Sequence, residues 1–132
     1  MDPNRVFGVD PKMAEDGRWF DYIDGSRVLV ARTNNKKFRA AIQKRLKPYR
    51  LMSRVPPDIM DRITCEAMAD AILLGWEGFE SNGAPLSYSR EAVVQLLTVL
   101  PDFRDDISAL AGNLEDFKRA GDEEAEKNLS SA

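Results

Sequence analysis

The side chains best suited to chemistry in this sequence are two groups of carboxylates in its C-terminal third. Asp102, Asp105 and Asp106 lie at the start of a predicted helix, and Glu115 and Asp116 are adjacent. Paired carboxylates can act as general acid and general base, but acids are also common where a helix dipole is positive. The sequence contains no glycine-rich phosphate loop and no serine motif with a base. We therefore predict no catalytic residues and no enzymatic activity.

The remaining reactive side chains are scarce. The sequence contains no histidine, and Cys65 is its only cysteine. A zinc site or a Cys–His nucleophile pair therefore cannot be built, and no internal disulfide can form. A solitary thiol is typical of proteins from a reducing compartment. We expect neither a metal nor any other cofactor.

Length and composition are those of one globular domain. The 132 residues are 43% hydrophobic and 31% charged, and the net charge is −3. That net charge does not match DNA or an anionic membrane. No apolar run approaches the roughly 20 residues that span a bilayer, and the N-terminus lacks a signal-peptide pattern. We therefore expect a cytoplasmic protein without a membrane partner.

Charge is unevenly distributed along the chain. Ten basic residues and no acidic one lie between Arg27 and Arg54, whereas ten acidic and three basic residues lie between Glu91 and Glu126. The basic block could contact nucleic acid through a helix over 34–48, because phosphate binding depends on clustered Lys and Arg. The residues of this candidate basic face are Lys36, Lys37, Arg39, Lys44, Arg45 and Lys47.

The motifs that read base edges are missing, so nucleic acid is the weaker interpretation of the basic block. Such blocks are more often a solvated face, or a partner for an acidic surface in the same or another molecule. Opposite charges on two halves of a chain favour head-to-tail self-association. That contact would weaken as salt screens the charges.

The N-terminal part of the chain is predicted to contain a β-hairpin. Aromatic and β-branched residues at 19–23 and 27–32 favour strands, and the Asp-Gly pair at 24–25 supplies the positive φ angles of a tight turn. Residues 1–17 mix proline, glycine and charges, which predicts a flexible segment with at most a short strand over 5–9.

Helices are predicted to follow the hairpin. Asn34 and Asn35 are candidate N-caps of a helix that Pro48 stops. The prolines and the acid at 56–58 start a second helix. Its broad apolar stripe extends to Gly75, which indicates a central, well-buried helix.

Two more helices complete the predicted domain. Ser89 caps the third, and Asp102 caps a fourth that extends to Phe117. The sequence thus predicts one α+β domain over 18–120, mostly α, in which an N-terminal β-hairpin packs on about four helices. Residues 121–132 are predicted to be an acidic, disordered tail.

Two groups of apolar side chains are candidate partner-binding surfaces. A narrow stripe on the last helix is either its core face or a seam for a partner helix. This stripe consists of Phe103, Ile107, Leu110, Leu114 and Phe117. Large side chains in the loop after Gly75 either anchor an interface or fasten the loop to the core. These loop residues are Trp76, Phe79, Leu86 and Tyr88.

An ordered set of short motifs covers about residues 18–120. Its parts are Trp19-Phe20-Asp21-Tyr22-Ile23-Asp24-Gly25, Arg27-Val28-Leu29-Val30-Ala31-Arg32, Asn34-Asn35-Lys36-Lys37-Phe38-Arg39, Lys47-Pro48-Tyr49-Arg50, Leu74-Gly75-Trp76-Glu77-Gly78-Phe79, Asn82-Gly83-Ala84-Pro85-Leu86-Ser87-Tyr88-Ser89, Phe103-Arg104-Asp105-Asp106-Ile107 and Asn113-Leu114-Glu115-Asp116-Phe117. In this order the motifs resemble the tail assembly chaperones of long-tailed bacteriophages and prophages. Those small proteins are encoded between the tail tube protein and the tape measure protein.

The resemblance implies a protein that coats the tape measure protein, keeps it soluble, and helps to recruit tail tube protein. It implies work in the cytoplasm of the bacterial host and absence from the mature virion. In many such phages a translational frameshift also yields a longer form, and this chain resembles the short one.

Two other functions are compatible with the sequence. One is a small nucleic-acid-binding regulator that uses the basic helix over 34–48. The other is a head–tail connector or another structural virion protein, which would share the small size and the helical content.

Overall fold

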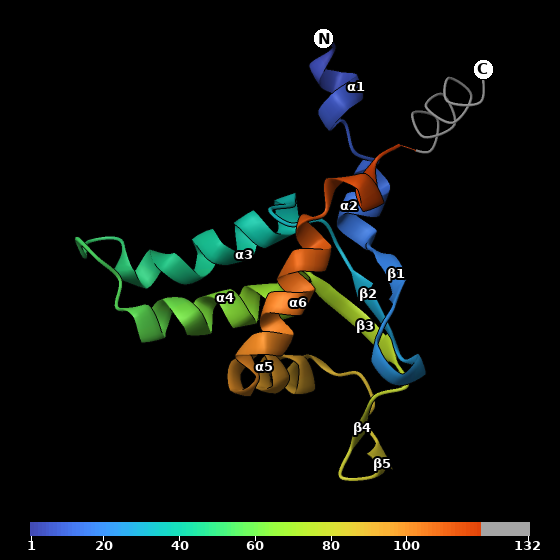
Figure 1. Cartoon of the computed structure of the whole chain (residues 1–132). Helices are drawn as coiled ribbons and strands as arrows, with labels where there is room; N and C mark the ends of the chain where they lie inside the picture. Colours follow the sequence, from blue (N-terminus) through green and yellow to red (C-terminus); the bar gives the residue numbers. More distant parts are fainter. Residues whose placement is uncertain (120–132) are drawn as a thin grey trace.

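The computed structural model describes residues 1–119, and it has the predicted mostly helical α+β architecture (Figure 1). In chain order the elements are α1 (Pro3–Phe7), α2 (Pro11–Asp16), β1 (Arg18–Asp21), η1 (Ile23–Gly25), β2 (Arg27–Val30), α3 (Lys36–Leu46), η2 (Lys47–Tyr49), α4 (Pro57–Ala71), β3 (Leu73–Glu77), β4 (Glu80–Ser81), β5 (Ala84–Pro85), α5 (Arg90–Val99), α6 (Pro101–Gly112) and η3 (Leu114–Phe117), where η marks a 3-10 helix. The predicted acidic tail over 121–132 lies outside the described residues.

The predicted hairpin is confirmed, and it is part of a larger sheet. Strands β1 and β2 pair antiparallel, with Phe20 opposite Val28. Asp24 and Gly25 turn the chain with φ values of 56° and 76°. On its other edge β2 pairs antiparallel with β3, which places Trp76 opposite Val28 and gives the strand order β1-β2-β3.

Strand β3 corrects the prediction that the second long helix continues to Gly75. Helix α4 ends at Ala71, and the following residues pair with β2. The run Ile72-Leu73-Leu74 suits a helix as well as a strand by its local pattern. The unpaired edge of β2 decides between them, because each added residue satisfies backbone donors and acceptors there.

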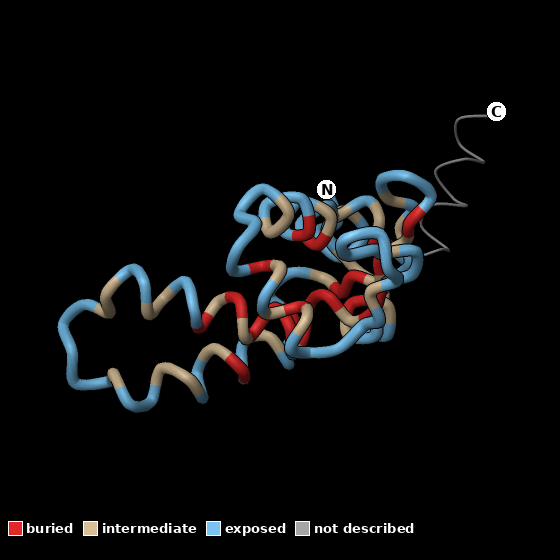
Figure 2. The backbone as a smooth tube through the Cα atoms, turned by 90° about the horizontal axis from the view of Figure 1, so that it is seen from below, coloured by how far each residue is buried: buried red, intermediate tan, exposed pale blue. Residues whose placement is uncertain are grey.

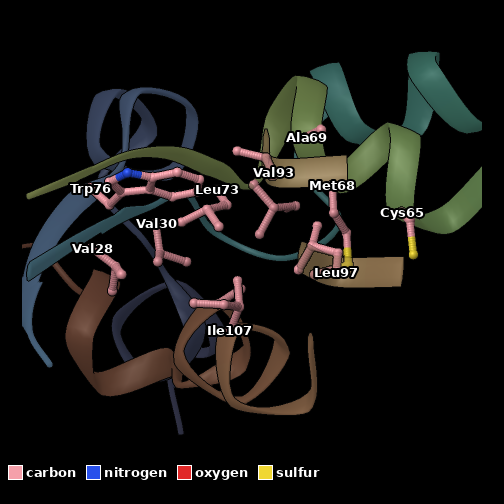
Figure 3. Packing of buried hydrophobic residues seen from close by; sticks show 12 residues of the cluster. Val28, Val30, Cys65, Met68, Ala69, Leu73, Trp76, Val93, Leu97 and Ile107 are labelled. Carbon is pink, nitrogen blue, oxygen red and sulfur yellow. The ribbon is translucent and has the colours of Figure 1, made fainter. Parts of the chain in front are cut away.

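The core lies between one face of this sheet and helices α4, α5 and α6. Val28 and Val30 alternate with the less buried Leu29, so that both valines face the helices with no exposed surface. Figure 3 shows them directed towards residues from the three helices. These helical residues are Met68 from α4, Val93 and Leu97 from α5, and Ile107 from α6.

Helices α3 and α4 form an antiparallel pair that projects from the body of the molecule (Figures 1 and 2). We call this pair the arm and residues 47–56 its tip. Arg45 joins the two helices, because its guanidinium lies 3.0 Å from Glu66 and 2.6 Å from Asp70. Arg90 contacts the same Asp70 carboxylate at 2.6 Å, which connects the arm to α5.

Asn35 fixes the base of the arm. As predicted, it caps α3, because its side-chain oxygen accepts a hydrogen bond from the backbone N–H of Phe38 at 2.9 Å. Its side-chain nitrogen donates to the carbonyls of Arg32 at 2.9 Å and Ala71 at 3.0 Å. One nearly buried amide therefore joins the exit of β2, the start of α3 and the end of α4.

The fourth predicted helix also differs in its limits. Asp102 is not its N-cap; Leu100 holds that position, and Asp102 lies in the first turn. The helix stops at Gly112, and the residues before Phe117 form the separate η3. Asn113 starts η3 by accepting a hydrogen bond from the N–H of Glu115 at 3.2 Å.

Residues 1–17 contain regular structure that the sequence analysis did not predict. The short strand expected over 5–9 is wrong, because α1 occupies most of that stretch. Asp2 and Asp10 each accept backbone hydrogen bonds and each precedes a proline, which is a strong helix-start signal. Helix α2 joins the domain through Ala14, whose carbonyl accepts from the Arg32 N–H at 2.9 Å.

We expect Asn35→Ala to lower the free energy of unfolding by about 2–4 kcal/mol, because it removes a helix cap and the side-chain donor to two carbonyls. Ser89→Ala is the matched control, since Ser89 makes only a cap bond, to the Ala92 N–H. That control should cost about 1 kcal/mol. Urea unfolding measures the free energy of unfolding of both variants. An equal decrease in the two variants would show that the two hydrogen bonds donated by the Asn35 side chain add no stability beyond the helix cap.

Candidate protein-docking hollow

An open hollow of about 420 Å³ lies where three distant parts of the chain meet. The turn between β1 and β2 forms one side, the segment around β4 forms the second, and the α5–α6 corner forms the third. Its apolar and aromatic lining consists of Tyr22, Ile23, Phe79, Leu86, Leu96, Leu100 and Phe103. Of these, Ile23 is 61% exposed and Leu100 is 48% exposed.

Stacked and edge-on aromatic rings support this hollow. The Trp76 and Phe79 rings stack at 4.7 Å between centroids, and Phe79 meets Phe103 edge-on at 5.9 Å. Tyr22 meets Phe103 edge-on at 6.2 Å. Such ring pairs add about 0.5–1.5 kcal/mol each beyond burial, so they help to hold Phe79 and Phe103 in place beside the hollow.

The segment 76–88 is held against the core by two long-range hydrogen bonds. The indole N–H of Trp76 donates to the carbonyl of Leu86 at 2.9 Å, and the hydroxyl of Tyr88 donates to the carbonyl of Leu73 at 2.8 Å. Of the four predicted loop residues, Trp76 and Tyr88 therefore fasten the segment to the core, whereas Phe79 and Leu86 line the hollow.

The predicted seam on the last helix does not form a continuous surface stripe. Ile107 and Phe117 have no exposed surface, because they pack in the interior. Phe103, Leu110 and Leu114 are half-buried, and Leu114 lies on η3 rather than on α6. Within the seam Phe103 alone lines the hollow, so the remainder of the stripe is mainly a core face.

The rim of the hollow is acidic. Its described lining includes Asp24 and Glu80 and contains no Lys or Arg. On the floor, the Tyr22 hydroxyl donates a hydrogen bond to Asp106 at 2.7 Å. Burial, and then this hydrogen bond and the Asp106 charge, raise the pKa of Tyr22 to about 12. Tyr22 is therefore a neutral donor at physiological pH.

Sequence reasoning missed the most exposed apolar residues of the site. Ile23 was assigned to a strand and Leu100 was not a candidate site residue, yet both lie at turns. The available signal was their position next to turn-forming pairs, Asp24-Gly25 and Pro101-Asp102. An apolar side chain at a surface turn either covers the core or is offered to a partner.

The predicted basic face is present with one exception. Within the described part of the chain, the exposed basic residues of this face have no acidic partner; they are Lys36, Lys37, Arg39, Lys44 and Lys47. Arg45 instead points across the arm to Glu66 and Asp70.

Residues 1–119 contain neither a metal-binding cluster nor a membrane-spanning helix. No cluster of three or more His, Cys, Asp or Glu side chains there could hold a metal ion. No helix in that range has the length and hydropathy needed to cross a membrane. The buried thiol of Cys65 lies 3.4 Å from Nη1 of Arg104, which also lies 3.8 Å from Asp61.

Comparison with known protein families places the chain beside prophage proteins. The family model described as YdaY prophage protein matches residues 33–128. No curated protein matches the chain, and no solved structure does. The matched range includes the arm, β3 and the α5–α6 corner, whereas the β1–β2 hairpin precedes it.

We expect one tyrosine to ionise near pH 12 in a spectrophotometric titration of the folded protein. Tyr22→Phe should remove this step, and Asp106→Asn should lower its pKa, because the hydrogen bond and the charge that oppose ionisation are gone. The folded pKa lies above the ordinary value of 10.0, so Tyr22 ionisation is a destabilising event. Its stabilising contribution is complete below about pH 10 and is lost as the pH rises through about 12. An unchanged tyrosine titration in Tyr22→Phe would contradict the assignment.

Proposed function

The chain belongs to the YdaY prophage protein family, and from that premise we propose that it is a tail assembly chaperone. It coats the tape measure protein, keeps that long helical protein soluble, and helps to recruit tail tube protein. It acts in the cytoplasm of the bacterial host and leaves before the virion is complete. Its work is binding rather than catalysis.

The observation that carries this proposal is the open apolar hollow. Its exposed apolar lining residues, Ile23 and Leu100, lie beside the aromatic rings of Tyr22, Phe79 and Phe103. An amphipathic helix is recognised when its apolar face enters such a groove. The tape measure protein of a long-tailed phage is a helical partner of that kind, and its own apolar faces need cover before the tail tube surrounds them.

The size of the hollow supports a removable coat. A volume of about 420 Å³ holds few side chains, so one copy would bind one short helical segment of the tape measure protein with low affinity. Many weak contacts along one long partner give high avidity, while each copy can still dissociate. A coat that must give way to tail tube protein needs this combination.

The resemblance of the ordered motifs to tail assembly chaperones adds the remaining parts of the proposal. These are the contact with tail tube protein, the absence from the mature virion, and a longer form made by translational frameshift. The first two are tested by co-purification with tail tube protein and by analysis of purified virions. A virion containing this chain would instead favour a head–tail connector or another structural protein.

A second candidate function is supported by the exposed basic residues of α3. Lys36, Lys37 and Lys44 are exposed on one helix and have no acidic partner among the described residues. Clustered cations can neutralise phosphates without reading bases. The net charge of −3 opposes this function for the whole chain.

We expect co-expression to raise the soluble yield of the tape measure protein encoded beside this chain. Ile23→Asp and Leu100→Asp should each reduce that gain several-fold, because a charge in the hollow opposes entry of an apolar helix face. Phe7→Asp is the matched control, since Phe7 is 60% exposed on α1 and does not line the hollow. If both hollow variants raise the soluble yield as much as the unaltered chain does, the tape measure protein binds another surface. If the unaltered chain does not raise the soluble yield, the chaperone function is rejected.

We expect the chain to bind duplex DNA weakly at physiological salt. Fluorescence anisotropy of a labelled duplex at two salt concentrations is the measurement. A regulator that neutralised several phosphates would bind tightly and lose affinity steeply with salt, with a slope of about −0.9 per phosphate in a log–log plot. Such a slope, abolished by Lys36→Glu with Lys37→Glu, would favour the second candidate function.

A further inference from the structure

We propose that the tip of the arm of one copy enters the hollow of a second copy, so that copies of this chain associate head to tail. The contact joins two different surfaces, the tip over 47–56 and the hollow beside the β1–β2 turn. The inference does not depend on the chaperone function, because it concerns this chain alone.

The tip exposes apolar side chains that no other segment within residues 1–119 covers. Leu51 is 93% exposed and the adjacent Met52 is 49% exposed. Both follow η2 at the outer end of the arm, and no other segment lies beside that end in Figure 1 or in Figure 2. Two neighbouring apolar side chains at a projecting end are typical of a surface that meets a partner.

The hollow offers the complementary shape. Its volume of about 420 Å³ has room for two aliphatic side chains, and Ile23, Phe79 and Leu100 would surround them. Leu51 and Met52 are flexible enough to fit between these walls, since Met in particular adapts to irregular gaps. Entry of the tip would cover the most exposed apolar residues of both surfaces at once.

The charges of the two surfaces are opposite. The tip contains Lys47, Arg50 and Arg54 and no acidic residue. The described lining of the hollow contains Asp24 and Glu80 and no basic residue. Complementary charges steer the encounter and fix the orientation, whereas two tips or two hollows repel each other. The pairing of tip with hollow is therefore favoured over either symmetric pairing.

The tip does not fill the hollow of its own chain, because Leu51 remains 93% exposed. Asn35 fixes the base of the arm, and Arg45 ties its two helices together, which keeps the tip directed outwards. Each copy thus carries one tip and one hollow that do not meet within the same chain. Heterologous contacts of this kind build open chains or closed rings rather than a two-fold dimer.

One consequence rests on the proposed function. If the hollow also receives tape measure helices, then a second copy and the tape measure protein compete for the same surface. Head-to-tail association would then keep the hollow covered until the tape measure protein is made.

The experiment is sedimentation velocity of the purified full chain over a range of concentrations. We expect association that weakens as salt rises from about 0.1 M to about 1 M, where the screening length falls from about 10 Å to about 3 Å. Leu51→Asp in the tip and Ile23→Asp in the hollow should each weaken association at least about tenfold, as for central contact residues. Phe7→Asp should associate like the unaltered chain, because Phe7 belongs to neither surface.

Mixing the two deficient variants gives the decisive measurement. Leu51→Asp retains an intact hollow and Ile23→Asp retains an intact tip, so the mixture should form a one-to-one dimer that neither variant forms alone. A mixture that stays monomeric, or association that survives in either variant, overturns the proposal. A monomeric unaltered chain overturns it as well, and leaves the chaperone function to be judged by tape measure solubility.

Discussion

The structure depends on the backbone that leaves β2, because residues 31–35 hold the ends of three helices. The N–H of Arg32 donates to Ala14 at the end of α2, and the N–H of Thr33 donates to Ala111 at the end of α6, both at 2.9 Å. The side-chain nitrogen of Asn35 then donates to the carbonyl of Ala71 at the end of α4 at 3.0 Å. Helix C-termini carry carbonyls without partners inside the helix, and this short segment donates a hydrogen bond to one carbonyl at each of the three ends. The arm, the sheet and α6 are thereby placed relative to one another from a single point.

The elements that the sequence predicted are those encoded by local chemistry. Asn35 and Ser89 signal helix starts through a side-chain oxygen near free N–H groups, and the Asp-Gly pair at 24–25 signals the hairpin. Strand β3 was not predicted, because its residues form a strand and not a helix only by pairing with β2, which lies more than 40 residues earlier in the sequence. The break at Asn113 was missed because apolar residues continue at helical spacing across it, towards Phe117.

The hollow shows a second limit of sequence reasoning. Phe79, Leu86 and Phe103 were candidates, but they were assigned to two separate surfaces, and the structure brings them together. The basic face was predicted from a block of like charge, and the seam from helical periodicity. Periodicity indicates that residues share a face, but it does not indicate what covers that face. Burial excludes Ile107 and Phe117 from any surface: α6 packs Ile107 into the core, and η3 places the Phe117 ring 6.2 Å from that of Phe20 on β1.

An exposed apolar hollow is unfavourable in water and would tend to collapse or to bind other apolar surfaces. The residues around this hollow oppose both tendencies. The acids of the rim, Asp24 and Glu80, keep the surface hydrated and repel other acidic surfaces. The aromatic floor keeps the hollow open, because collapse would require stacked rings such as Trp76 and Phe79 to separate. Under the proposed function, a surface already held in place would lose little conformational entropy on binding, so that even a small apolar contact would contribute affinity. The same smallness limits that affinity, which is why a single hollow suits repeated and reversible contact with protein chains.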